Sequence, residues 1–262
     1  MRKALLGLLK SKPRDELGLS EEDGVRYLHF GSIWIQGGML LRDPYYLQLD
    51  YTRQLFAGIL FHPEPKRIML LGLGAASATK FAWKQFPRAR VTTVELNPSV
   101  IHFARQNFHL PPDSTRINTV AADAADWIAA HPQSADYLVV DVYDAAAQGP
   151  VLSSVEFYTD CRNALITDRL SVMVVNLFGK DRSFKTNLTN IQRAFDGRVL
   201  MLPATARGNL IVFGLAGPEA AFAWGELRAR AALLHDSTGL EFSNWISGFR
   251  KMNRSDAAGL PV

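Results

Sequence analysis

The stretch from Arg67 to Glu95 reads RIMLLGLGAASATKFAWKQFPRARVTTVE and decides the fold. It opens with a short apolar run that ends in a glycine turn, a pattern typical of a strand buried on both faces of a sheet. Glycine has no Cβ, so Gly72 and Gly74 let the backbone turn sharply and approach a ligand closely. Residues 75–86 contain helix formers with apolar residues at helical spacing, and they predict a helix directly after the turn.

A second apolar strand, 91–94, ends in Glu95. This carboxylate lies about twenty residues after the glycine turn, where doubly wound folds place the acid that binds a ribose. The sequence therefore predicts a nucleoside-cofactor pocket at the carboxyl ends of these two strands. The alternative is that the glycines only allow close packing of strand and helix, and that Glu95 is a solvated strand end. Asn97 and Pro98, which open a new helix, favour the pocket.

From Arg67 onward, strand-like and helix-like segments alternate, which predicts a parallel sheet with helices on both faces. The expected strands are 68–71, 91–95, 116–121, 137–141, 171–177, 199–202 and 210–214, and the expected helices are 75–86, 98–108, 124–130, 153–165 and 184–195. The short loop 203–209 allows only an antiparallel pair. The predicted fold class is α/β: a seven-stranded, mostly parallel, Rossmann-like sheet with a terminal antiparallel hairpin, as in S-adenosylmethionine-dependent methyltransferases.

The N-terminal part reads differently. Residues 1–20 are expected to form a loosely attached helix or tail, and 25–30 and 32–36 to form a small β-hairpin region, with Gly37 and Gly38 in the following loop. An apolar face in 45–61 predicts a helix across the mouth of the pocket. We divide the chain into an N-terminal region, 1–62, and a nucleoside-binding catalytic domain, 63–262. After Pro218 we expect one more amphipathic helix.

The composition of the chain narrows the classes of partner and site that it can have. The 262 residues are 48% hydrophobic, enough for a full core, and the net charge of +4 comes from dispersed Lys and Arg, so no nucleic-acid partner is expected. No stretch has the length of a membrane span and no signal peptide is recognised, so we expect a cytoplasmic protein without a membrane partner. The one cysteine, Cys161, is expected to be a buried small hydrophobe. The six scattered histidines predict no metal site.

Several segments, in this order, resemble the spermidine synthases, the polyamine aminopropyltransferases, and most closely the short bacterial spermidine-synthase-like proteins. The similarity covers the chain from Gly24 to Leu215. The segments that carry it are LGLG at 71–74, VELNP at 94–98, ADA at 122–124, DYLVVDVYD at 136–144, GP at 149–150 and SVEFY at 154–158. Each is weak evidence alone, whereas the ordered set is specific for the fold and the cofactor class.

The resemblance implies roles for the residues of the cofactor site, which includes Gly72 and Gly74. Glu95 would accept hydrogen bonds from the two ribose hydroxyls. Asp123 would accept one from the adenine amino group, and the backbone of Ala124 would complete the adenine site. Asp123 can also be the N-cap of the following helix. The implied co-substrate is decarboxylated S-adenosylmethionine or S-adenosylmethionine itself, with no metal.

The resemblance also implies that Asp141 orients an attacking amine and helps to remove its proton, while Asp144 holds the remaining cationic end. A primary amine is protonated at neutral pH, so it needs a base before it can attack. Tyr51 matches a tyrosine that the family projects onto the substrate amine, although an ungapped register puts Asp50 there. The alternatives are that Asp141 only closes its strand, Asp144 caps a turn and Tyr51 is a core aromatic.

Departures from the family pattern leave the reaction open. Ala75 stands where typical members have an aspartate that meets the amine of the decarboxylated donor. Arg53 stands in place of an acid; facing the pocket it would suit a carboxylate, and otherwise it is an ordinary exposed helix arginine. Three hypotheses follow: aminopropyl transfer to a diamine such as putrescine, methyl or other alkyl transfer on the same fold, or a non-catalytic member that keeps the fold. The partner would be a small-molecule amine, and a homodimer is compatible with the family.

Overall fold

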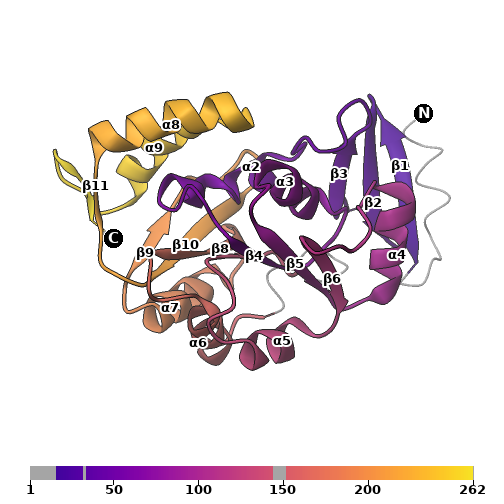
Figure 1. Ribbon diagram of the computed structural model, residues 1–262, viewed down its shortest axis with the longest axis horizontal. Coiled ribbons are helices and arrows are strands. Elements are labelled where there is room, and N and C mark those ends of the chain that lie inside the picture. The colour runs from indigo at the N-terminus through magenta and orange to yellow at the C-terminus, as the bar shows by residue number, and fades with distance from the viewer. Residues whose placement is uncertain (1–15, 32–33, 144–151, 262) are drawn as a thin grey trace.

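A seven-stranded sheet runs through the computed structural model, which describes residues 16–31, 34–143 and 152–261 (Figure 1). Its strands are β4 (Arg67–Leu71), β5 (Arg90–Glu95), β6 (Ile117–Ala121), β7 (Tyr137–Val140), β8 (Ser171–Phe178), β9 (Val199–Met201) and β10 (Asn209–Ala216). Their order across the sheet is β6-β5-β4-β7-β8-β10-β9. Strands β4 to β8 are parallel, and β10 is antiparallel to both β8 and β9. The predicted fold class is confirmed.

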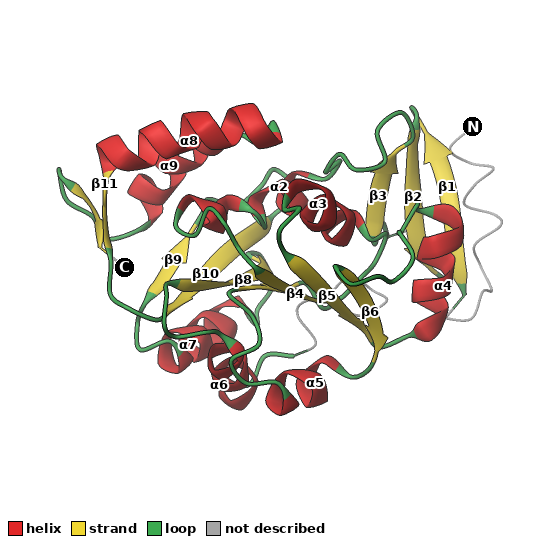
Figure 2. Ribbon diagram, viewed as in Figure 1, coloured by secondary structure: helices red, strands yellow, loops and turns green. Residues whose placement is uncertain are grey.

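Successive side chains on a strand point to opposite sides of the sheet. A strand that is apolar throughout therefore supplies apolar side chains to both faces. Ile68 and Leu70 of β4 enter one hydrophobic core, whereas Met69 and Leu71 enter the other. The second core is covered by α5 (Ala124–Ala130), α6 (Val155–Ala164) and α7 (Phe184–Ala194), which lie below the sheet in Figure 2. Cys161 is fully buried in α6, as expected.

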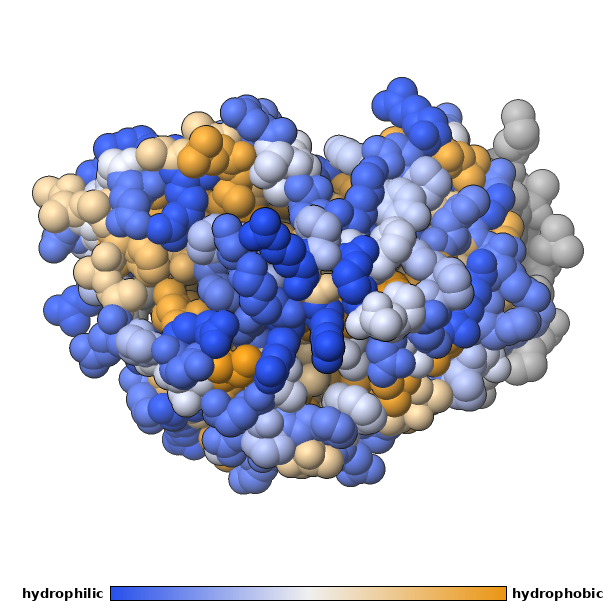
Figure 3. Space-filling model, viewed as in Figure 1, coloured by the Kyte–Doolittle hydropathy of each residue, from blue (hydrophilic) through white to orange (hydrophobic). Residues whose placement is uncertain are grey.

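The opposite face is covered by α3 (Ser77–Gln85), by α2 (Asp50–Gln54) with the 3₁₀ turn η1 (Ala57–Leu60), and by two C-terminal helices. These are α8 (Trp224–Thr238) and α9 (Phe242–Met252), where one helix was expected. The Phe249 ring of α9 packs 5.1 Å from that of Phe61 and 5.2 Å from that of Phe213, so the tail completes the core over β9 and β10. A short pair, β11 (Ala221–Ala223) and β12 (Gly259–Pro261), flanks the helices. The face of the molecule seen in Figure 3 is mostly hydrophilic, with apolar residues among the polar ones.

The N-terminal expectations need three corrections. Residues 17–22, expected to be a tail, form β1 (Leu17–Glu22), and the glycines expected in a loop belong to β3 (Gly37–Leu40). Both strands pair with β2 (Val25–Phe30), which was predicted correctly, in a small antiparallel sheet beside α4 (Pro98–Asn107) (Figure 1). Of the expected strand 32–36, residues 34–36 are irregular, and 32–33 lie outside the described residues.

Two of these corrections, and a fourth that concerns the helix expected at 45–61, have a physical cause. None of the β1 side chains is fully buried, so the strand lacks an alternating apolar signal. Gly37 lies against the glycine turn, where an added Cβ would be 2.6 Å from the Ala75 Cβ, so glycine here permits close packing. The expected helix 45–61 shrinks to α2 and η1 because residues 55–61 are buried on all sides, so their apolar character reflects burial and not a helical stripe.

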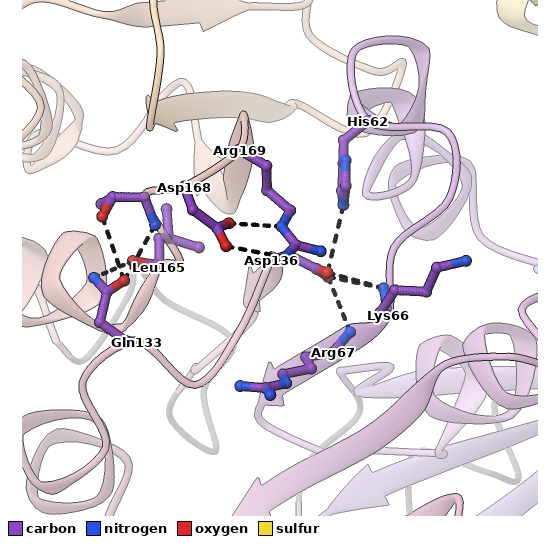
Figure 4. Close-up of polar contacts among 9 residues, drawn as sticks. His62, Lys66, Arg67, Gln133, Asp136, Leu165, Asp168 and Arg169 are labelled. Atoms are coloured by element: carbon purple, nitrogen blue, oxygen red, sulfur yellow. Dashed lines mark hydrogen bonds and ion pairs between the residues drawn. The ribbon is translucent and has the colours of Figure 1, made fainter.

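A buried carboxylate fastens the amino ends of β4 and β7 together (Figure 4). Asp136 is fully buried and accepts hydrogen bonds from the backbone N–H groups of Lys66 (2.9 Å) and Arg67 (3.0 Å). The His62 Nε2 atom lies 3.6 Å from its Oδ2 atom. Burial, the largest influence, raises the pKa of Asp136, but the close contact with His62 and the hydrogen bonds from the Arg67 and Lys66 N–H groups together lower it below its ordinary value. A buried charge needs such partners to be tolerated.

The variant Asp136→Asn should lower the free energy of unfolding at pH 7 by about 1–3 kcal/mol, because an amide NH₂ would face backbone donors. The pKa of Asp136 is lower in the folded protein than in the unfolded chain. Its contribution is therefore present above the unfolded value, near pH 4, and is lost as the pH falls through the folded value. Urea unfolding at several pH values measures this difference. Asp168→Asn, which removes an exposed carboxylate paired with Arg169, is the control and should change little. Equal stability of wild type and Asp136→Asn would refute the assignment.

Candidate active site

A pocket of about 980 Å³ opens at the carboxyl ends of β4, β5, β7 and β8. Seven of the residues predicted for the site line it: Tyr51, Gly72, Gly74, Glu95, Asp123, Ala124 and Asp141. The eighth, Asp144, lies outside the described residues. The fold thus brings the described members of the set to one cavity, and the role of each is still a prediction.

The glycine turn after β4 passes directly over the end of β7. Gly72 has φ +94°, and a Cβ there would collide with the carbonyl oxygen of Asp141. The Gly72 N–H donates to the Val94 carbonyl (2.8 Å), and the Asp141 N–H donates to the Leu71 carbonyl (2.9 Å). The ends of β4, β5 and β7 are therefore held at close backbone distance, and only glycine fits at their junction.

Glu95 is not a solvated strand end. Its Oε2 atom accepts a hydrogen bond from the Leu73 N–H (3.1 Å), and its Oε1 atom accepts one from the Asn97 N–H (3.0 Å). Burial raises the pKa of Glu95, and these backbone hydrogen bonds offset only part of that rise. The carboxylate fixes the glycine turn, and each oxygen retains acceptor capacity for a ligand in the pocket.

Asp123 is the N-cap of α5, the alternative that the sequence left open. Its Oδ1 atom accepts hydrogen bonds from the N–H groups of Ala125 (2.7 Å) and Asp126 (3.3 Å). The side chain is exposed and lines the pocket, and its Oδ2 atom has no partner among the described residues. Capping and ligand binding can therefore coexist at this residue.

Asp141 is held by a chain of polar side chains that the sequence analysis missed. The Asn176 Nδ2 atom donates to the Asp141 Oδ1 atom (2.9 Å), and the Asn209 Nδ2 atom donates to the Asn176 Oδ1 atom (3.1 Å). The Tyr143 hydroxyl donates to the Asn176 carbonyl (2.8 Å). Asn176 is 3% exposed. One signal could have identified it: an asparagine within an otherwise apolar strand must find hydrogen-bond partners.

Tyr51 faces Asp141 across the pocket. Its pKa is raised above the ordinary value by burial first, and then by the charge of Asp141. The pKa of Asp141 is raised by burial and held back by the hydrogen bond from Asn176 and by the nearby Tyr51 hydroxyl. Of the two residues that the register allowed, Tyr51 lines the pocket, whereas Asp50 is exposed and pairs with Arg53 (2.6 Å).

Arg53 and Ala75 were the two departures that favoured a carboxylate-bearing donor. Arg53 points away from the pocket: its Nε atom lies 3.0 Å from the Glu241 Oε1 atom, and its other nitrogens bond Asp50 and the Leu47 carbonyl. Of the two alternatives that the sequence left open for Arg53, the one outside the pocket agrees with the structure, because Asp50 and Glu241 bind the guanidinium there. Ala75 does line the pocket, with a buried methyl group in the position of the missing aspartate.

Within the part of the chain that the structure describes, no group of three or more His, Cys, Asp or Glu side chains could hold a metal ion. Among the helices there, none is both long and apolar enough to cross a membrane.

The sheet order, the glycine turn and an acid at the end of the second strand define a Rossmann-like fold with a candidate nucleoside site. Residues 52–221 match the family model described as the spermine/spermidine synthase domain, which is more than half of the chain. The chain belongs to the spermine/spermidine synthase family.

Similar proteins agree with this placement. The polyamine aminopropyltransferase of Chromobacterium violaceum is 34% identical over 94% of this chain and 94% of its own length. The structure of a probable spermidine synthase from Corynebacterium glutamicum has a TM-score of 0.69 at 22% identity, over 92% of this chain and 93% of that one. Human methyltransferase-like protein 13 in complex with SAH has a TM-score of 0.64 at 22% identity, over 80% and 96%. At these identities the two structures show a shared fold only.

We expect Gly72→Ala to disturb the site and the fold together, because the new Cβ collides with the Asp141 carbonyl and φ is positive. The free energy of unfolding should fall by about 1–3 kcal/mol in urea titrations. Gly225→Ala in α8, where an added Cβ meets nothing within 4 Å, is the matched control and should be neutral or stabilising. Identical unfolding midpoints for Gly72→Ala and wild type would contradict the close approach of β4 and β7.

Proposed function

We propose that this protein is an aminopropyltransferase that moves an aminopropyl group from decarboxylated S-adenosylmethionine to a small-molecule amine such as a diamine. The observation that carries the proposal is the placement of Asp141, hydrogen-bonded to Asn176 and facing Tyr51, in one pocket with Glu95. The name of the Chromobacterium relative supports the same reaction class.

In the proposed complex the nucleoside lies over the ends of β4, β5 and β6. Glu95 accepts hydrogen bonds from the ribose hydroxyls, and its own backbone bonds hold it in place before the ligand arrives. The free Oδ2 atom of Asp123 accepts a hydrogen bond from the adenine amino group, and Ala124 lies beside it at the start of α5.

The reaction is proposed to occur beside Asp141. The acceptor amine attacks the sulfonium-bound carbon, the N–C bond forms, the C–S bond breaks, and the sulfonium becomes a neutral thioether. The proton released by the amine passes to the Asp141 carboxylate. Tyr51 and Asn176 fix the orientation of that carboxylate, so in-line positioning provides much of the rate. Asp144 keeps its predicted role as a second carboxylate for the acceptor.

Methyl transfer from intact S-adenosylmethionine is the second candidate, and Ala75 is the observation that favours it. The buried methyl group leaves no carboxylate after the glycine turn to bind the donor amine. Arg53 no longer supports this candidate, because it pairs with Glu241 and Asp50. Calorimetry with the two donors separates the candidates, since tighter binding of intact S-adenosylmethionine would contradict aminopropyl transfer. Binding of neither donor would favour a non-catalytic protein.

Three broader assignments belong to the proposal. The first is the boundary between 1–62 and 63–262, and its support is the separate N-terminal sheet, although α2 and η1 pack into the core of the large sheet. The second is a cytoplasmic location, for which the single cysteine suits a reducing compartment, and the third is a homodimer, which rests on the family resemblance.

The variant Asp141→Asn should lower kcat by at least about 100-fold, because the amide cannot accept the proton of the amine. Binding of 5′-methylthioadenosine, measured by calorimetry, should change little, because the nucleoside contacts are made by other residues. Asp236→Asn, an exposed carboxylate on α8, is the matched control. Turnover that survives Asp141→Asn would remove this residue from the mechanism.

The pH dependence of kcat tests whether the hydrogen bond from Asn176 affects Asp141. Asp141 must be ionised to accept a proton, so kcat should fall as the pH falls through its pKa, which lies above the ordinary aspartate value. Asn176→Ala removes a hydrogen bond that lowers this pKa, so the acidic limb of the pH–rate profile should move to higher pH. Asn107→Ala on α4 removes a side chain whose hydrogen bond lies within its own helix, and it should leave the acidic limb unchanged. A limb that stays in place in Asn176→Ala would show that Asn176 does not tune Asp141.

A further inference from the structure

Three basic side chains line the same pocket and have no part in the mechanism above. They are Lys180 and Arg182, which follow β8, and Arg207, which precedes β10. All three are exposed, and their side chains form no hydrogen bond or ion pair with any residue that the structure describes. The neighbouring acid, Asp181, accepts a hydrogen bond from the Ser183 N–H (2.7 Å) at the start of α7.

The two basic segments lie side by side. The Gly179 N–H donates to the Gly208 carbonyl (2.9 Å), and Phe178 is paired with Asn209 in the β8–β10 register. Lys180 and Arg207 therefore flank the same backbone contact. Their positive charges meet at one end of the pocket.

This end of the pocket is the acceptor end. In the order of the strands, β7 lies between β4, β5 and β6, over whose ends the nucleoside is proposed to bind, and the strands β8 and β10. Asp141 directly follows β7. Asp141 connects through Asn176 on β8 to Asn209 on β10, two residues after Arg207. A donor whose nucleoside is bound by Glu95 presents its reactive carbon near Asp141, so the acceptor extends from there towards the basic residues.

A plain diamine suits this arrangement poorly. It carries a positive charge at each end at neutral pH, and its far end would approach three cations, beside which Asp181 is the one acid among the described residues that line this end. Asp144, outside the described residues, keeps its proposed role toward an ammonium group of the acceptor. An arginine fork and a lysine instead match a carboxylate, which they bind through charge-assisted hydrogen bonds.

We propose that the acceptor is an amine that also carries a carboxylate, with the amine at Asp141 and the carboxylate bound by Arg207, Lys180 and Arg182. The inference rests on the proposed aminopropyl transfer and names the chemical class of its acceptor. The bond changes are those given above, with the N–C bond forming, the C–S bond breaking and the proton passing to Asp141.

The test compares putrescine with ornithine, which is putrescine bearing one α-carboxylate. With decarboxylated S-adenosylmethionine as donor and release of 5′-methylthioadenosine as the readout, kcat/KM should be at least about tenfold higher for ornithine, the scale of one charge-assisted hydrogen bond. Arg207→Gln and Lys180→Gln should each lower that value about tenfold through KM and leave putrescine turnover unchanged or improved. Arg228→Gln, an exposed arginine on α8, is the control and should affect neither substrate.

Three results would overturn the inference. The first is equal or better use of putrescine, with no response to Arg207→Gln, and this leaves aminopropyl transfer intact. The second is that the basic residues bind the carboxylate of the donor and not that of the acceptor. In that case Arg207→Gln would weaken the binding of intact S-adenosylmethionine but not the binding of ornithine. The third would come from calorimetry on the protein saturated with 5′-methylthioadenosine: ornithine should bind more tightly than putrescine whether or not turnover occurs, and equal or tighter binding of putrescine would overturn the inference. Absence of turnover with both amines counts against the proposed function, whereas absence of this binding preference counts against the inference.

Discussion

The close approach of the glycine turn to the end of β7 is the constraint on which the rest of the site depends. Because Gly72 lies against the Asp141 carbonyl, two segments about seventy residues apart in the sequence share one backbone junction. Glu95 reinforces the junction from β5 by accepting the Leu73 N–H. Glu95, the acid proposed for the nucleoside, and Asp141, the proposed base, are thereby fixed relative to each other before any ligand binds, which is the preorganisation that the proposed displacement at a sulfonium carbon would require.

The two edges of the sheet use buried carboxylates in opposite ways. At the amino edge, Asp136 is surrounded by donors, and its pKa is lowered, so it stays ionised and holds strands together. At the carboxyl edge, Asp141 has fewer donors, and its pKa is raised by burial. A carboxylate that binds protons more readily is better suited to exchange one with a substrate. The difference comes from the number of hydrogen bonds that each environment provides.

How much could be predicted differed between the two parts of the chain. The strands and helices from Arg67 to Ala216 were placed within about two residues, because strands buried on both faces leave long apolar runs that sequence patterns detect well. The small N-terminal sheet was largely missed. Its edge strand β1 buries little, and its strand β3 contains glycines whose purpose is packing against Ala75. Apolar patterns carry no information about such contacts between distant segments.

The sequence alone determined the α/β class, the glycine turn and the identity of the acids that close the strands, because these follow from local pattern and from position along the chain. Only the tertiary structure decided which side chains meet. It turned Arg53 away towards Glu241, joined Asn176 and Asn209 to Asp141, and gathered Lys180, Arg182 and Arg207 at one end of the pocket. Each of these outcomes depends on strand order across the sheet, and hydrogen-bond partners from neighbouring strands have no fixed separation in sequence.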